Sequence, residues 1–137
     1  MTRLVTLFCF LFIIGACGEK TNLNTKTVGT PEELEEAIKN VQAGDNIVMA
    51  NGIWKDVQIK FIGEGTEDKP ITIKAETPGK VFIEGLSDLK FGGKYLVVDG
   101  LHFRNGHSPS EAVLEFRVDE NTIGNHCTVT NCVIEDF

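Results

Sequence analysis

Residues 69–106 read KPITIKAETPGKVFIEGLSDLKFGGKYLVVDGLHFRNG, and this stretch decides the fold. Apolar and polar residues alternate over 71–75 and over 81–84, and two further apolar runs follow at 95–98 and 101–103. Glycine, proline, asparagine or aspartate separates each run from the next. Short runs rich in β-branched and aromatic residues, divided by turn residues, predict a series of short β-strands.

The spacing between similar runs is more informative than the runs themselves. Residues 47–51 resemble residues 71–75, which begin 24 residues later, and residues 57–61 resemble residues 81–85 at the same interval of 24 residues. Recurrence at a fixed interval is typical of a solenoid, in which each coil buries its apolar side chains only against its neighbours.

A third recurrence has a longer interval. Residues 98–103 resemble residues 129–134, which begin 31 residues later, and the polar residues 106–111 between them predict a loop that lengthens one coil. Together these recurrences predict an all-β chain folded as a right-handed parallel β-helix. Evenly spaced strands also occur in β-sandwiches and β-barrels, which are the alternative folds.

Further apolar runs and polar segments complete the predicted coils. We expect additional strands at 47–50, 57–61, 113–116, 127–130 and 132–135. We expect polar loops at 64–69, 105–111 and 119–125. Such loops leave one side of a β-helix and often wall a groove.

One segment has the pattern of a helix. Thr30 can cap it, Pro31 suits the first helical position, and Glu33 can complete a capping box. Apolar residues at helical spacing then mark one face: Leu34, Ala37, Ile38 and Val41. We expect a helix over 31–41 that covers the N-terminal end of the coil stack, because a solenoid needs a cap there. A membrane-surface helix is a weaker alternative, since the polar face is mostly glutamate.

Two of these stretches also carry a family resemblance. PITIKAETPGKVFIEG (70–85) and YLVVDGLHFRNG (95–106) resemble polysaccharide lyase family 6, which contains alginate lyases and chondroitinase B-like enzymes. The flanking residues 51–69 and 126–137 fit the same pattern, so that the resemblance covers about 28–137. It implies the N-terminal coils of a β-helix lyase that cleaves a uronate polysaccharide, most often alginate, by β-elimination.

The resemblance also implies a lysine base, an arginine acid and a calcium ion held by asparagine and glutamates. Those motifs belong to later coils of the family's fold, and we match no catalytic or calcium-binding residue to a position here. We therefore expect 28–137 to be the C-terminally truncated, N-terminal part of a longer lyase, with an open last coil and no activity alone.

Two other functions are compatible with a β-helix. The first is a non-catalytic, glycan-binding or structural surface lipoprotein. The second is a glycoside hydrolase, which needs two carboxylates on one face. Glu135 and Asp136 are adjacent in the sequence, so on a strand they would point to opposite faces, which disfavours them as that pair.

Composition limits the partners. The chain of 137 residues has room for one domain, and 20 acidic residues against 13 basic ones give a net charge of −7. This balance argues against nucleic acid, because phosphate binding needs a basic face. An anionic polysaccharide would need a local basic groove. The candidate substrate contacts are His107, Arg104 and Lys74, although the simpler interpretation is that these side chains are only solvated. Trp54 could stack on a sugar ring or pack inside the first coil.

The first residues have the pattern of an export signal. Arg3 precedes an apolar run at 4–14, and Ile-Gly-Ala-Cys at 14–17 resembles a bacterial lipobox. We expect a signal peptide at 1–17, lipidation of Cys17, a tether at 18–27 and a β-helix at 28–137. The protein would then be exported and anchored by lipid to a bacterial membrane or cell surface. An ordinary secretory signal is the alternative.

Two cysteines lie within the predicted coils. Cys127 and Cys132 alternate with or flank polar residues, as inward-facing core residues would, and their spacing is not that of a zinc site. We expect free, buried thiols, with a disulfide as the alternative in an exported protein. His102, on the strand at 101–103, is expected to face outward.

Overall fold

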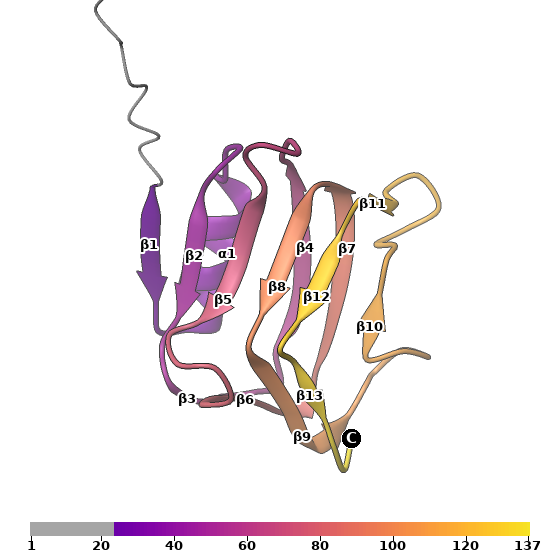
Figure 1. The fold of residues 1–137 in the computed structure, drawn as a ribbon. Coiled ribbons are helices and arrows are strands. Elements are labelled where there is room, and N and C mark those ends of the chain that lie inside the picture. Colours follow the sequence, from indigo (N-terminus) through magenta and orange to yellow (C-terminus); the bar gives the residue numbers. More distant parts are fainter. Residues whose placement is uncertain (1–23) are drawn as a thin grey trace, which may run out of the picture.

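The computed structural model describes residues 24–137, and Figure 1 shows their parallel sheets wound into a stack of coils. Sheet A has the order β1 (Thr25–Val28), β2 (Asn46–Met49), β5 (Ile71–Ala75), β8 (Leu96–Asp99) and β12 (Thr128–Thr130). Sheet B contains β3 (Gly52–Lys55), β6 (Val81–Leu86), β9 (Leu101–His107) and β13 (Val133–Ile134). Sheet C contains β4 (Gln58–Glu64), β7 (Asp88–Lys94), β10 (Leu114–Glu115) and β11 (Gly124–Asn125).

The order of the strands along the chain confirms a parallel β-helix. The chain visits sheets A, B and C in turn, and each strand pairs in parallel with the strand one coil away rather than with its neighbour in sequence. Hairpin-built sandwiches and up-and-down barrels have antiparallel neighbours instead. Those alternative folds are therefore wrong for residues 24–137.

Two of the three predicted recurrences have the wrong register. Ile47 is the partner of Ile73 rather than Ile71, and β4 pairs with β7, so that residues 57–61 and 81–85 lie in different sheets. The cause is physical. Side chains alternate with a period of two along a strand, so a shift of two residues leaves the apolar pattern unchanged. The loop 76–80 between β5 and β6 also lengthens the second coil ahead of sheet B.

The third recurrence is confirmed. Val129 is the partner of Val98 and Ile134 is the partner of Phe103. The left-handed corners repeat at the same interval, with φ of 51° and 52° at Tyr95 and His126 and 51° and 48° at Asn105 and Asp136. The extra length has two sources: the loop 108–113 ahead of β10, and residues 116–123 between β10 and β11. The first overlaps the predicted loop 105–111 and the second overlaps the predicted loop 119–125, of which residues 124–125 form β11.

The inward side chains form columns along the stack. Trp54, Ile83 and Phe103 follow one another in sheet B, and Phe61 and Phe91 do so in sheet C with their ring centroids 6.0 Å apart. Phe61, Ile83, Phe91 and Phe103 are completely buried. Each such side chain contributes about 1.5–3 kcal/mol through its removal from water.

The helix α1 (Pro31–Lys39) ends two residues earlier than the predicted Val41. Thr30 accepts a hydrogen bond from the Glu33 amide at 3.2 Å, and the Glu33 carboxylate accepts one from the Gly29 amide at 2.7 Å. The buried face, Leu34, Ala37 and Ile38, packs against β1, β2 and β4, as the predicted cap requires. No helix within 24–137 is long and apolar enough to cross a membrane.

Two expectations concern the start of the chain. Residues 25–27 were expected in the tether, but they form β1 with Val28 and pair with β2, because β-branched threonines suit an edge strand of sheet A. The signal peptide, the lipidation of Cys17 and the rest of the tether lie outside the described residues.

Candidate functional site

The outer face of sheet B carries a row of alternating charges. Its members are Lys55, Glu84, Arg104 and Glu135, one from each successive coil; we call them the charged row. Lys55 is the register partner of Glu84, and the amide of Glu135 bonds the carbonyl of Phe103 at 3.0 Å, one position before Arg104. Outward positions of parallel strands stack in columns, which brings residues far apart in the sequence together.

Arg104 is the most tightly held cation of this row. Its Nε donates a hydrogen bond to Glu84 Oε1 at 2.9 Å, and its guanidinium carbon lies 3.5 Å from the centroid of the Phe82 ring. The Asn105 side-chain amide also donates to Glu84 Oε1, at 3.4 Å. The side chains of Arg104 and Glu84 are 30% and 16% exposed, so this pair is shielded from water more than most surface ion pairs.

His102 provides the second interaction between coils on this face. Its ring lies 5.5 Å from that of Phe82, and its Nε2 is 2.7 Å from Glu135 Oε1. The ring faces outward, as the sequence predicted, but only 16% of the side chain is exposed. His102 therefore ties the strand β9 to the segment that follows β13.

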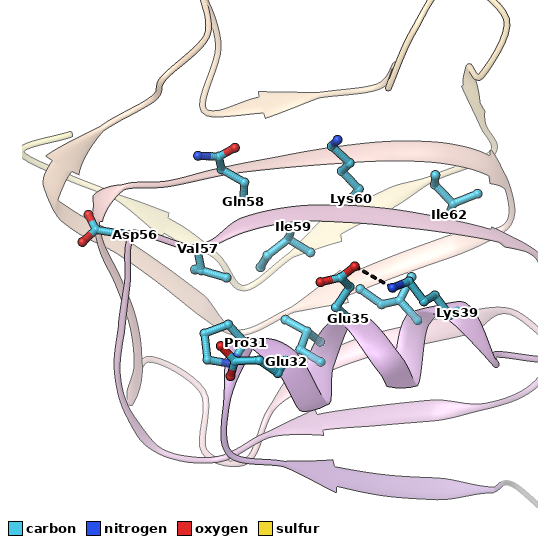
Figure 2. A pocket seen from close by; sticks show the side chains of 12 residues that line it. Pro31, Glu32, Glu35, Lys39, Asp56, Val57, Gln58, Ile59, Lys60 and Ile62 are labelled. Atoms are coloured by element: carbon cyan, nitrogen blue, oxygen red, sulfur yellow. Dashed lines mark ion pairs between the residues drawn. The ribbon is translucent and has the colours of Figure 1, made fainter.

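A concave surface lies between α1 and β4. It is a groove of about 630 Å³, and Figure 2 shows the Glu35 and Lys39 side chains of α1 beside it. Val57 and Ile59 point toward the helix, whereas Gln58 and Lys60 point away from it (Figure 2). The hydrogen bond and the charge of Lys39, with Nζ 2.7 Å from the carboxylate, lower the pKa of Glu35. The charges at the rim are of both signs, so the groove does not favour an anionic ligand.

A third cluster lies on the outer face of sheet C. Lys90 Nζ is 3.3 Å from Glu115 and 3.8 Å from Asp88, whose carboxylate also accepts a bond from Ser110 at 3.2 Å. Asp88 is only 4% exposed. The ammonium group occupies the space between the two carboxylates, so this cluster joins β7 to β10 and to the loop 108–113 rather than offering an open site.

The structure separates the three substrate contacts expected from the sequence. Arg104 and His107 both lie on β9, whereas Lys74 lies on β5 in sheet A, where Asp99 is its register partner. His107 is exposed beside Leu86 at the end of β9. Phe82 and Glu84, which hold Arg104, were missed. Their alternation with Val81 and Ile83 was a signal that they face outward.

Other expectations are settled by burial. Trp54 is 4% exposed and its indole donates a hydrogen bond to the carbonyl of Ala50 at 3.0 Å, so it packs in the core and the sugar-stacking reading is wrong. Cys127 and Cys132 are free thiols that face the core but are only partly buried. Burial raises the pKa of both thiols.

The described residues do not fit the calcium ion implied by the resemblance. Nowhere within 24–137 do three or more histidine, cysteine, aspartate or glutamate side chains gather in a way that could hold a metal. The Asp88 and Glu115 carboxylates already surround the ammonium of Lys90, and Glu135 is already bonded to His102.

Comparison with known proteins places this geometry in a family. Residues 28–137 match the family described as Chondroitinase B. The solved family 6 alginate lyase AlyGC has 42% sequence identity and a TM-score of 0.78 over 80% of this chain. A mannuronic acid-specific family 6 lyase from the human gut microbiota has 30% identity and a TM-score of 0.73 over 82% of it. No curated protein matches the chain.

A further relative is the family 6 polysaccharide lyase Pedsa3628 from Pseudopedobacter saltans, with 38% identity and a TM-score of 0.70 over 78% of this chain. The aligned part makes up only 15% of AlyGC, 26% of the gut lyase and 24% of Pedsa3628. This chain thus corresponds to a limited part of each relative. The match over 28–137 and these identities show that the chain belongs to the chondroitinase B family of polysaccharide lyases, family 6.

Proposed function

We propose that this protein takes part in the cleavage of a uronate polysaccharide, alginate in the first place, by β-elimination. The observation that carries the proposal is the 42% identity to AlyGC over 80% of the chain. AlyGC is an alginate lyase and the gut lyase is specific for mannuronic acid, which favours alginate over dermatan or chondroitin sulfate as the substrate.

The chemistry of the reaction defines what the described residues contribute. Removal of the C5 proton needs a base with a suitable pKa and a group that neutralises the neighbouring carboxylate. When bound, calcium would supply that neutralisation, but the described residues do not form its site. Arg104 is bonded to Glu84, and Lys90 lies between two carboxylates. We therefore assign to 24–137 the role of cap and first coils, a scaffold rather than a catalytic centre.

The test is a chimera. Residues 28–137 replace the matching coils of AlyGC, and alginate cleavage is followed by the ultraviolet absorbance of the unsaturated uronate product. We expect the chimera to cleave alginate and the 137-residue chain alone to release no product. Product from the chain alone would contradict the scaffold role.

A folded but inactive chimera would contradict a part in the lyase reaction. It would favour the second candidate, a non-catalytic glycan-binding or structural protein, if the chain still bound alginate. The pairing of Arg104 with Glu84 and of His102 with Glu135 is the observation that keeps this candidate open, because these contacts hold the coils together without any substrate.

We also propose that the protein is exported and held on a bacterial membrane or cell surface by a lipid on Cys17. The support is the lipobox-like Ile-Gly-Ala-Cys at 14–17 and a polymeric substrate that is met outside the cell. Metabolic labelling with a fatty acid in a bacterial host tests this. The wild-type chain should carry the label, and Cys17→Ala should not. Equal labelling of both would contradict the proposal.

A further inference from the structure

We propose that Arg104 forms a carboxylate-binding subsite for a uronate residue on the outer face of sheet B, apart from any catalytic centre. The inference rests on the proposed function for its ligand class. Its structural basis is the way in which Arg104 is held.

The guanidinium of Arg104 is fixed on one side only. Nε donates to Glu84, and one face lies on the Phe82 ring at 3.5 Å. Within 24–137 neither terminal nitrogen, Nη1 or Nη2, donates a hydrogen bond to a side chain or carbonyl. These nitrogens form the fork that binds a carboxylate through two parallel hydrogen bonds. Because the side chain is already ordered, binding costs less conformational entropy than it would at a free surface arginine.

The nearby carboxylates are already engaged, which favours an anionic guest at this position. Glu84 accepts hydrogen bonds from Arg104 and Asn105, and Glu135 is paired with His102. Lys55 adds a positive charge next to Glu84. The charged row is therefore neutral as a whole, and a carboxylate would be recognised by the fork geometry rather than by a positive field.

A second row beside the charged row suits the body of a sugar. It consists of Ile53, Phe82, His102 and Val133, which are register partners across the coils. Ile53 is 62% exposed and Val133 is 43% exposed. Apolar patches on one side and an arginine fork on the other match a uronate, which has C–H faces and one carboxylate. Lys74 on sheet A lies between its register partners Val48 and Asp99 and has no aromatic ring in register with it.

The 137-residue chain is titrated with a mannuronate oligosaccharide at low salt, and the binding affinity is measured by calorimetry. We expect Arg104→Ala to weaken binding at least tenfold and Arg104→Lys, which keeps the charge but loses the fork, to weaken it nearly as much. Arg117→Ala is the matched control, because Arg117 is 59% exposed and lies near β10 of sheet C; its binding should equal that of the wild type. A carboxyl-reduced oligosaccharide should not distinguish wild type from Arg104→Ala.

Thermal unfolding of each variant shows whether it is folded. If Arg104→Ala is unfolded, the test relies on Arg104→Lys. Wild-type affinity in both Arg104 variants, or no uronate binding by the wild type, would overturn the subsite. The chimera reports separately on the proposed function. An active chimera together with unchanged binding in the Arg104 variants would support the proposed function and contradict the subsite.

Discussion

The outer faces of sheets A and B share one coil repeat but differ in chemistry. On sheet A, short polar residues such as Thr72 and Thr130 alternate with Val48 and Val97, and within the described part of the chain Lys74 forms no ion pair. On sheet B, Arg104 is stacked and paired, and His102 is bonded to Glu135. The inward side chains set the fold, so the outward positions are free to differ, and of sheets A and B it is sheet B that carries paired charges.

The largest effect on stability is expected in the buried core, because the core supports the outer faces of both sheets. Phe103→Ala removes a fully buried ring from the middle of the stack and should lower the free energy of unfolding by about 3–5 kcal/mol. Urea unfolding followed by circular dichroism measures it. The neighbouring outward substitution His102→Gln should cost no more than about 1 kcal/mol. Equal losses in both variants would contradict the division into inner and outer faces.

The next effect on stability concerns two glycines with left-handed backbone, Gly93 in sheet C and Gly79 in the loop before sheet B. Gly93 has φ of +109°, and a Cβ there would collide with the carbonyl oxygen of Gly63. Gly79 has φ of +75° but nothing within 4 Å of the Cβ position. Gly79→Ala should therefore cost about 1 kcal/mol from the left-handed backbone alone. Gly93→Ala should cost at least about 2 kcal/mol, because close packing between coils adds to the strain. Chemical denaturation of both variants measures these costs, and a larger cost for Gly79→Ala than for Gly93→Ala would contradict the expectation.

A direct comparison of the two outer faces should give smaller changes. Arg104→Ala leaves Glu84 without its main partner and uncovers Phe82, so we expect a loss of about 1–2 kcal/mol in unfolding free energy. Lys74→Ala on sheet A should change it by less than about 0.5 kcal/mol. Thermal unfolding of both variants at low and high salt would measure these two changes in stability. A larger loss from Lys74→Ala would mean that the ordered face has been assigned to the wrong sheet.

The smallest effect on stability is expected from the two thiols of the last coil. Burial raises the pKa of Cys127 and Cys132, so the folded state holds these protons more tightly than the unfolded state does. The resulting stabilisation is present below the ordinary thiol pKa and is lost as the pH rises through the folded-state value. Alkylation at mildly alkaline pH, mapped by peptide mass spectrometry, should be slower in the folded chain than in urea. Equal or faster alkylation in the folded chain would contradict the partial burial of these two thiols.

The sequence could predict the fold class but only part of the register. The block 98–103 recurs with its own left-handed corners, so the interval of 31 residues to 129–134 was visible. Alternation of period two hid the shift from Ile71 to Ile73. The strand β7 was missed because Gly92 and Gly93 indicate a turn, whereas the absence of a Cβ there allows two coils to approach closely.

The candidate site was only half predictable. Arg104 was one of the candidate substrate contacts, but Glu84 lies 20 residues away in the sequence and meets it only through the coil stack. Lys74 looked equivalent, since both lysine and arginine occupy outward positions of alternating strands. What separates them is the aromatic ring of Phe82 beneath Arg104, a contact that depends on the register between β6 and β9.

The most direct test of the account is the rate of alginate cleavage by the AlyGC chimera that carries residues 28–137, compared with the same chimera bearing Phe103→Ala or Arg104→Ala. We expect an active chimera, loss of activity with loss of fold for Phe103→Ala, and a raised KM with a nearly unchanged kcat for Arg104→Ala. A stably folded chimera without lyase activity would contradict the claim that these coils are the scaffold of a family 6 lyase.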